Sequence, residues 1–416
     1  MAEIAEVVDS VLFLESAPFV NGEVSLDGGS ACRQVVKLLG SRLDNLACSH
    51  ITIEAEESEM AWPDDRIQNL LGIELPIIQA PMAGAAFSEM AIGVSEAGGL
   101  GSLACALLTA DQIVEEVTII RRQTSRPMNL NFFCHHPPKA DAQREASWRR
   151  VLEPYFIELG LDPAAARSVS ARAAFDSAMC DLVAELKPNV VSFHFGLPEK
   201  TLVARVRAIG AKILSTATTV REAQWLESEG CDAIIAQGFE AGGHRGMFLT
   251  DDPYTQIGTL SLVPQVVDSV KVPVIAAGGI ADARGIAAAF ALGAAAAQIG
   301  TAYLLSPEAR ISPLHRQALR SERNQTVLTN VFTGRPARGV ATRMVREIGP
   351  ISELVPDFPL AGGFSAPLRA ASEAKGITDF TPMWSGQSAC LAREFPAKEF
   401  TQRLASETLA KLTRRG

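Results

Sequence analysis

The chain has 416 residues, 47% of them hydrophobic, so it is long enough to bury a large core. Only 6% of the residues are aromatic while alanine and glycine are frequent, which favours closely packed α/β layers over an all-β fold. The formal net charge of -9 comes from residues 1–65, which hold 13 of the 47 acidic and 3 of the 38 basic residues. The remainder is nearly neutral, so the composition does not indicate a protein that binds nucleic acid through a basic surface.

The cysteines and the apolar segments bear on the cellular compartment. The seven cysteines are odd in number and none has CxxC spacing, which predicts reduced thiols and a cytoplasmic location. The acidic start predicts no secretory signal peptide. Residues 285–307 carry no charge and have the length of a membrane span, but they are rich in alanine and glycine. We expect a buried helix followed by a buried strand there, and no association with a membrane.

The N-terminal segment differs from the rest of the chain. Residues 54–65, "EAEESEMAWPDD", hold six acids and no base, which is typical of a solvated linker. We therefore predict that residues 1–65 form an extension outside the main fold, disordered or weakly ordered.

From Leu75 onward, short apolar runs alternate with helical stretches, with glycine or proline at most junctions. The expected strands are residues 76–80, 100–104, 128–133, 190–194, 212–216, 232–236, 273–277 and 296–300. Strands that alternate with helices imply parallel pairing and right-handed crossovers. Eight such units predict an α/β fold of the (β/α)8 TIM-barrel type. A doubly wound open sheet is the alternative.

Two long insertions interrupt this alternation, residues 135–173 after the third strand and residues 306–380 after the eighth. Connections that follow barrel strands lie at the C-terminal face, where substrates bind, so we expect both to cover the site. We predict a barrel formed by residues 66–305 and 381–416, with residues 306–380 as an inserted smaller lid or substrate domain.

Residues at the strand ends should face the site, and they are polar or glycine-rich with few charges. They are Pro81, Met82, Asn131, His194, Thr216, Gln237 to His244, Gly278, Gly279, Gly300 and Thr301. This set lacks the clustered carboxylates and histidines of a metal site, so no metal is predicted. It also lacks a nucleophilic serine or cysteine beside a base.

Two glycine turns indicate a phosphate site. "AAGGI" ends the seventh strand and "QIGT" ends the eighth, and the loops after these strands form the usual phosphate site of a barrel. Glycine lets the backbone approach an anion closely, so backbone N–H groups and Thr301 could bind it without a lysine. The alternative is that these glycines only permit tight turns.

The stretch "AQGFEAGGHRG" follows the sixth strand. The amide of Gln237 can donate and accept hydrogen bonds, which suits a flavin ring edge or a carbonyl. Gly242 and Gly243 offer backbone N–H groups and room for a flat ring. His244 could take a proton near neutral pH, or it could be a surface histidine in a mobile loop. Glu240 is more simply an exposed residue than a second acid.

Three other histidines lie near strand ends. His194 ends the fourth strand, either as a satisfied core residue or as a donor to an anionic substrate. His135 and His136 precede two prolines, and they are better interpreted as turn residues at the entrance than as a metal pair.

Taken together, these motifs resemble the nitronate monooxygenases, long called 2-nitropropane dioxygenases, and in particular the class I branch. The matching segments are "LLGIELPIIQAPMAG", "NFFCHHPP", "VVSFHFG", "AQGFEAGGHRG", "VPVIAAGGIADARG", "QIGTAYL" and "PMWSGQSACL". They run in the same order and spacing over about residues 70–400. The N-terminal extension has no counterpart in this pattern.

The resemblance implies FMN bound non-covalently to a TIM barrel that carries a smaller inserted domain. The residues implied in cofactor binding are Met82, Asn131, Gln237, Gly242, Gly243, Gly278, Gly279, Gln298, Ile299, Gly300, Thr301, Trp384, Gly386 and Gln387. His244 matches the active-site histidine of the family, and His194 could add a second donor. The implied partners are a small-molecule nitronate and O₂, with the chain as a monomer or homodimer.

The implied reaction oxidises alkyl nitronates, such as propionate 3-nitronate, with O₂ to carbonyl compounds and nitrite. His244 could stabilise the nitronate oxygens as an imidazolium, or abstract the α-proton of a neutral nitroalkane as a base, and the sequence leaves both roles open. The alternatives are an FMN-dependent NAD(P)H enoyl-acyl-carrier-protein reductase, an NADH:quinone reductase, and a non-catalytic FMN-binding barrel.

Overall fold

The computed structural model describes residues 62–139, 141–168, 172–321 and 325–413. The predicted extension therefore lies outside the described residues, except for its last four positions. The first element is helix α3 (Arg66–Leu71), which ends at Gly72 in a left-handed conformation, with φ of 68°.

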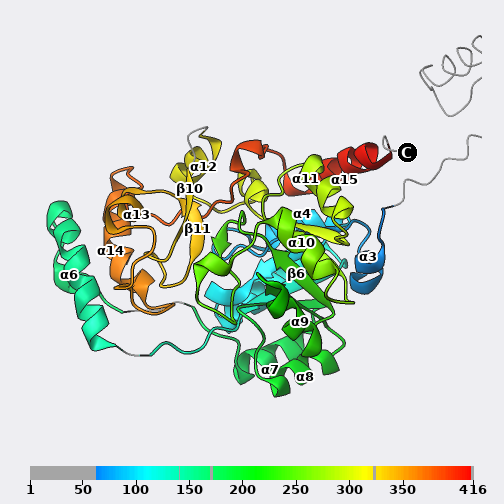
Figure 1. The fold of residues 1–416 in the computed structure, drawn as a ribbon, viewed down its shortest axis with the longest axis horizontal. Coiled ribbons are helices and arrows are strands. Elements are labelled where there is room, and N and C mark those ends of the chain that lie inside the picture. Colours follow the sequence, from blue (N-terminus) through cyan, green and yellow to red (C-terminus); the bar gives the residue numbers. More distant parts are fainter. Residues whose placement is uncertain (1–61, 140, 169–171, 322–324, 414–416) are drawn as a thin grey trace, which may run out of the picture. The chain divides into compact units, whose positions relative to one another are not determined.

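Eight parallel strands form the centre of the protein (Figure 1). They are β1 (Ile77–Gln79), β2 (Gly101–Ala104), β3 (Met128–Phe133), β4 (Val190–His194), β5 (Lys212–Ala217), β6 (Ala233–Gln237), β8 (Val274–Ala277) and β9 (Ala296–Ile299). All eight predicted strands are confirmed within one or two residues. The order around the sheet is β1, β9, β8, β6, β5, β4, β3 and β2.

The sheet closes on itself between its two end strands. Ile78 of β1 forms a parallel bridge with Leu100, next to β2. Gln79 N donates to Leu100 O at 3.0 Å, and Leu100 N donates to Ile77 O at 3.0 Å. The predicted TIM barrel is therefore confirmed, and the alternative of an open doubly wound sheet is wrong.

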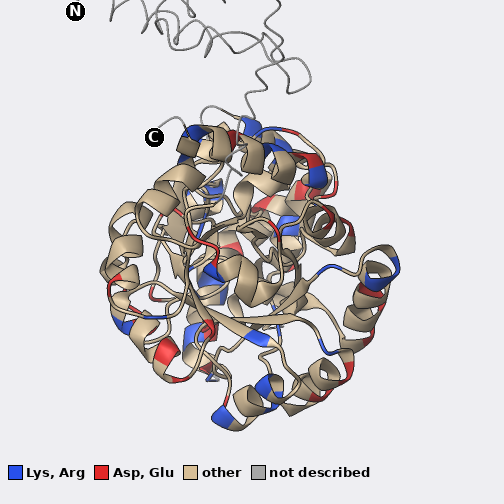
Figure 2. Cartoon of the chain, turned by 90° about the vertical axis from the view of Figure 1, so that its right-hand side faces the viewer, with Lys and Arg blue, Asp and Glu red and all other residues tan. Residues whose placement is uncertain are grey.

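Helices surround the strands, and charged residues of both signs are interspersed on them (Figure 2). The barrel helices are α4 (Ser88–Glu96), α5 (Ala110–Gln123), α7 (Ser177–Leu186), α8 (Lys200–Ala208), α9 (Val220–Ser228), α10 (Thr259–Val267), α11 (Ala283–Ala291) and α15 (Ala397–Thr413). Short 3-10 helices lie at Cys105–Leu107 (η1), Pro163–Ala165 (η2), Pro253–Thr255 (η3), Thr301–Leu305 (η4) and Ala389–Leu391 (η5).

Helix α5 shows how the sequence specifies these helices. Thr109 and Gln112 form a capping box, in which each side chain bonds the backbone of the other. Ile113, Val117 and Ile120 recur at helical spacing and are buried against the barrel. Burying each of these side chains contributes about 1.5–3 kcal/mol to the stability of the fold.

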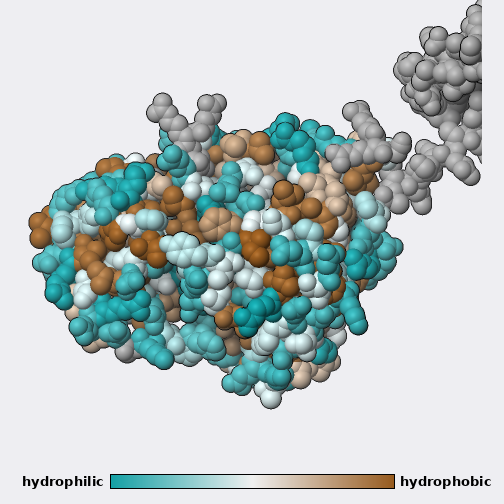
Figure 3. Space-filling model, viewed as in Figure 1, coloured by the Kyte–Doolittle hydropathy of each residue, from teal (hydrophilic) through white to brown (hydrophobic). Residues whose placement is uncertain are grey.

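The uncharged segment 285–307 forms the end of α11 and strand β9, as predicted. Strand β9 pairs with β1 on one side and β8 on the other, so it lies inside the barrel wall. Among the described residues, no helix is both long and apolar enough to cross a membrane. In the view of Figure 3, hydrophilic residues surround small, scattered apolar patches.

The two insertions fold against each other. They contribute α6 (Ala142–Leu159), α12 (Pro313–Arg320), β10 (Thr326–Thr329), β11 (Ala337–Val340), α13 (Arg343–Ile348) and α14 (Ala361–Ala374). We call α6, β10, β11, α13 and α14 the cap. Trp148 and Phe156 of α6 share a hydrophobic core with Phe332 and Phe364, and α6 lies beside α14 in Figure 1. The limits 306–380 for a separate domain stay a prediction, since the cap also includes α6.

A second, smaller sheet connects the cap with the barrel. Its order is β10, β11 and β7 (Gly243–His244), all antiparallel. Ala337 of β11 lies opposite His244. The glycine–histidine stretch is therefore not a free loop, because two of its residues form a strand against the cap.

Candidate functional site

A cavity of about 380 Å³ lies at the C-terminal ends of the barrel strands, below the cap. Fourteen of the sixteen predicted site residues line it. These are Met82, Asn131, His194, Gln237, Gly242, Gly243, His244, Gly278, Gly279, Gln298, Gly300, Thr301, Trp384 and Gly386. Ile299 does not line it and is buried in the core, because successive side chains of a strand point to opposite faces. Gln387 is exposed, and its backbone N donates to Glu240 O at 3.0 Å.

His194 is held by the protein through both ring nitrogens. Its Nε2 lies 3.1 Å from His244 O, and its Nδ1 lies 3.1 Å from Thr216 Oγ1. Because a carbonyl only accepts, the proton belongs on Nε2, and the Thr216 hydroxyl donates to Nδ1. Burial lowers the pKa of His194 to about 4, so the ring is neutral. Its role as a donor to substrate stays a prediction, and the contacts favour a part in holding β7.

The side chain of Gln237 is also used by the protein. Its Nε2 donates to His244 O at 3.0 Å, and its Oε1 accepts from Gly246 N at 2.8 Å. Both ends of the amide therefore fix the loop that carries His244. Its predicted contact with a flavin stays a prediction.

Arg245, which was not predicted as a functional residue, is fully buried directly after His244. Its guanidinium donates to Gln256 Oε1 at 2.8 Å, to Gly238 O at 2.6 Å and to Gln237 O at 2.7 Å. Burial lowers its pKa to about 9. Arg245 thus connects the His244 loop to the end of β6. In the sequence, only its position next to a histidine in a glycine-rich stretch could have indicated this role.

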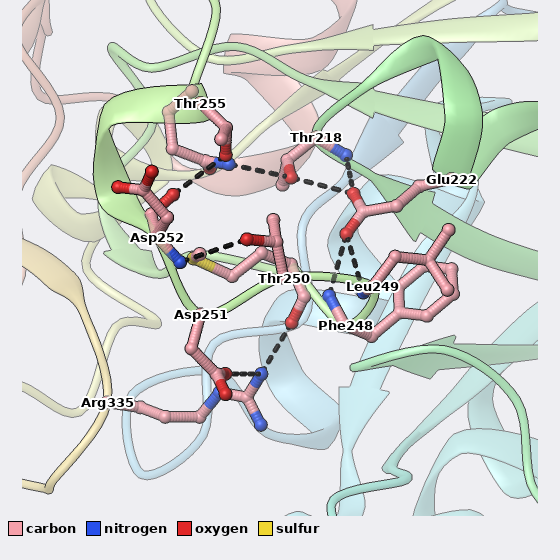
Figure 4. Close-up of polar contacts among 11 residues, drawn as sticks. Thr218, Glu222, Phe248, Leu249, Thr250, Asp251, Asp252, Thr255 and Arg335 are labelled. Carbon is pink, nitrogen blue, oxygen red and sulfur yellow. Dashed lines mark hydrogen bonds and ion pairs between the residues drawn. The ribbon is translucent and has the colours of Figure 1, made fainter.

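Glu222, which was also not predicted, is a buried carboxylate at the start of α9. It accepts bonds from Thr218 N and Oγ1, both at 2.7 Å, and from the backbone N of Phe248 at 2.7 Å and Leu249 at 3.2 Å (Figure 4). It therefore anchors the chain just beyond the His244 loop. Glu240 has a comparable structural contact, since Thr259 N and Oγ1 each donate to its Oε2 at 2.8 Å.

His244 itself is surrounded by aromatic rings and by positive charge. Its Nε2 lies 3.0 Å from Thr333 Oγ1, and its ring centre lies 5.3 Å from those of Phe358 and Trp384. Burial, followed by the charge of Arg172, holds its pKa well below the usual value. The imidazole is therefore neutral at neutral pH, which favours a base over a charged donor.

The charges around the cavity have one sign. Arg172, Arg310 and Arg369 line it, and no Asp or Glu does so among the described residues. Arg310 and Arg369 form ion pairs with Glu89 and Glu373, which lie outside the lining. Such a cavity attracts anions. These arginines were not predicted because they lie outside the strand ends. His315 was not predicted either; its Nε2 donates to Trp384 O at 3.0 Å and so holds the C-terminal segment at the cavity.

The glycine turns after β8 and β9 offer unpaired polar groups. Gly278 and Gly279 have φ of 107° and 72°, which favours glycine. Within the described part of the chain, no hydrogen-bond acceptor meets the backbone N of Gly279 or Ile280. Gln298 Oε1 is buried without a partner. These groups can serve a bound phosphate and a bound N–H donor. No group of three or more metal-ligating side chains occurs among residues that the structure describes.

The family model for nitronate monooxygenase matches residues 64–407. A nitronate monooxygenase from Pseudomonas aeruginosa is 42% identical over 346 residues, which cover 82% of this chain and 99% of the relative. The chain belongs to the nitronate monooxygenase family. It is accordingly an oxidoreductase of a flavin-dependent family.

Solved structures agree with this family assignment. Nitroalkane oxidase from Streptomyces ansochromogenes has a TM-score of 0.77 and 37% identity, and the match covers 84% of this chain and all of that one. FabK from Thermotoga maritima has a TM-score of 0.63 and 28% identity, covering 85% of this chain and 99% of its own. This member of the nitronate monooxygenase family thus shares its architecture with both proteins.

Proposed function

We propose that this chain is an FMN-dependent monooxygenase that oxidises alkyl nitronates with O₂ to carbonyl compounds and nitrite. The observation that carries the proposal is the place of His244, whose pKa is lowered by burial, in a cavity that three arginines and no described carboxylate line. A nitronate is an anion, which this cavity favours electrostatically. The names of the relatives in Pseudomonas and Streptomyces give it further support.

The residues of the cavity fit FMN. The unpaired backbone N–H groups of Gly279 and Ile280, with Thr301 beside them, can hold its phosphate. The orphaned Oε1 of Gln298 can accept from an N–H of its ring system. When bound, FMN supplies the electron acceptor for oxidation of the substrate.

His244 and the arginines divide the remaining work. The neutral imidazole can take the α-proton of a nitroalkane, whose C–H electron pair stays on the substrate and gives the nitronate. Arg172 lines the cavity, and its charge acts on His244, so it lies where it can stabilise that anion. We further propose that the cap acts as a lid that keeps water from the substrate.

The state of the cysteines is compatible with the proposed cytoplasmic location. The five cysteines in the described residues are all free, as expected for a protein of the reducing cytoplasm. Small molecules, a nitronate and O₂, are the proposed partners, with the chain as a monomer or homodimer.

The test is to purify the full chain, identify its flavin by spectrum and mass, and measure O₂ uptake and nitrite release with propionate 3-nitronate. We expect both signals, and little bleaching of the flavin by NADH without oxygen. Rapid bleaching by NADH without nitronate turnover would overturn the proposal in favour of an NAD(P)H-dependent reductase, the alternative that the likeness to FabK keeps open.

A substitution tests the role of the histidine. His244→Asn should lower kcat/KM for a neutral nitroalkane by about 10²- to 10⁴-fold, because a general base contributes that much. His136→Asn is the matched control, since His136 is exposed and does not line the cavity. Undiminished turnover of the His244 variant would exclude the proposed base.

A further inference from the structure

The hydroxyl of Thr333 is the one described side-chain group bonded to the ring of His244, at 3.0 Å from its Nε2. Thr333 belongs to the cap and is buried, 3% exposed. It is far from His244 in sequence. The contact joins the cap to the residue that the proposed function makes the base.

The position of Thr333 is fixed by its own turn. The backbone N of Thr333 donates to Asn330 O at 3.2 Å, and Gly334 N donates to the same oxygen at 2.8 Å. Gly334 has φ of 92°, and a Cβ there would lie 2.3 Å from Pro356 O, so only glycine fits this turn. The hydroxyl is therefore held in place by the backbone.

The segment that follows is anchored on the loop after His244. Arg335 Nη2 donates to Met247 O at 2.5 Å and lies 3.9 Å from Asp251 (Figure 4). Its guanidinium also stacks at 4.4 Å from the ring centre of Phe195. Two strands, β7 and β11, pair beside it. Thr333 and His244 are thus held together from both sides.

The hydroxyl of Thr333 has a second hydrogen-bond partner besides His244, the carbonyl of Arg335. Thr333 Oγ1 donates to Arg335 O at 3.3 Å. A hydroxyl has one proton, so when that proton is directed at Arg335 O the oxygen can only accept from His244, and this arrangement places the ring hydrogen on Nε2. The Nδ1 atom has no partner among the described residues and is not one of their buried orphan atoms, so it is open to the cavity.

We infer that Thr333 is a positioning residue that keeps the proton of neutral His244 on Nε2 and leaves the lone pair on Nδ1. The catalytic part of this inference rests on the proposed function. When Nδ1 takes the α-proton of a nitroalkane, the C–H electron pair stays on carbon. The imidazolium that forms then has both nitrogens protonated, and its Nε2–H still donates to Thr333.

The test reads the tautomer directly, without any turnover. The chain has six histidines, so ¹⁵N-histidine labelling of the full protein gives few signals, and His244→Asn assigns the one of interest. In the wild type we expect Nε2–H and an unprotonated Nδ1. Thr333→Val should shift the ratio of the two tautomers about fivefold, the equivalent of one lost hydrogen bond. Thr333→Ser should restore it.

Thr342→Val is the matched control, because Thr342 is a buried cap threonine whose hydroxyl has no partner. It should leave the His244 signal unchanged. A wild-type spectrum with Nδ1–H would overturn the inference even if the valine variant failed to fold. An unchanged tautomer ratio in folded Thr333→Val would also overturn it.

Kinetics separate this inference from the proposed function. Thr333→Val should lower kcat for a neutral nitroalkane about fivefold, with less than a twofold change for a preformed nitronate, which needs no proton removal. If the wild type oxidises neither substrate, the proposed function fails while the tautomer spectrum still decides the role of Thr333. Equal losses on both substrates would contradict the positioning role.

Discussion

The loop after β6 and the turns after β8 and β9 border the same cavity, but the protein uses their polar groups differently. In the β6 loop, the side chains of Gln237 and Arg245 form hydrogen bonds with backbone atoms of the loop itself. In the turns, Gly279 N and Gln298 Oε1 have no partner in the described chain. The strand ends therefore carry two groups of polar atoms, those that bond the loop itself and those without a partner in the described chain, which we propose serve the cofactor.

The largest expected effect is on stability in acid, because buried histidines lie in the β6 loop and next to it: His244 belongs to the loop, and His194 donates to the carbonyl of His244. The pKa values of His135 and His194 are lowered to about 4 and that of His244 is also lowered, from about 6.5 in an unfolded chain. The folded state thus binds fewer protons, so stability is complete above about pH 6.5 and is lost as the pH falls toward 4. Each histidine costs about 1.4 kcal/mol per pH unit in that window.

Urea unfolding at about pH 7 and about pH 5 measures this loss. His194→Asn should reduce the difference in unfolding free energy between the two pH values by the contribution of one histidine. Equal stability at the two pH values would mean that these imidazoles are solvated, which would contradict their burial in the folded protein.

The second effect is on the loop itself. Arg245→Met removes three hydrogen bonds and leaves two buried carbonyls and the partly buried Gln256 Oε1 without this donor, so we expect a loss of about 3 kcal/mol in the free energy of unfolding. Arg207→Met is the control, because exposed Arg207 also donates to a backbone carbonyl, that of Gly230. It should cost less than about 0.5 kcal/mol. A similar loss in both variants would refute the special role of Arg245.

The third effect is on the open turns and should appear in cofactor binding. Gly278→Ala places a Cβ 3.0 Å from Ala241 N at positive φ, so the turn must shift, and we expect at least about a tenfold weaker affinity for FMN. Gly210→Ala also has positive φ but meets nothing within 4 Å. Both variants should lose about 1 kcal/mol of stability, and only the first should lose flavin. Equal flavin titrations would count against the phosphate site.

The smallest effect concerns the charge of the cavity. Arg369→Gln should raise the KM for an anionic substrate two- to threefold, since a half-exposed charge contributes less than about 1 kcal/mol. Arg403→Gln is matched to it in exposure and in having a glutamate partner four residues away, but Arg403 does not line the cavity. Steady-state kinetics at low salt would show the difference, and parallel changes in both variants would argue against it.

The barrel could be predicted from sequence because its signals are local. Each strand is a short apolar run, most junctions hold glycine or proline, and each strand is buried over most of its length. The ends of the strands then gave Asn131, His194, Gln237 and His244, all of which line the cavity. Ile299 and Gln387 came from the resemblance, and strand alternation and exposure place them outside it.

What the sequence could not supply depends on contacts between distant segments. Glu222 resembles any acidic residue in a first helical turn until Phe248 and Leu249 fold onto it. Thr333 comes within hydrogen-bond distance of His244 only when β11 pairs with β7. Whether the Gln237 amide meets a ligand or a loop is likewise decided by where Gly246 lies.

The shared core of the cap has a consequence for how the chain is made. Trp148, Leu152 and Phe156 present an apolar face on α6, and their partners Phe364 and Phe380 emerge much later from the ribosome. Until then this face must stay without its partners while most of the barrel is synthesised between them. Contacts so distant in sequence form slowly, so nascent chains that stop short of α14 are the species most prone to aggregate.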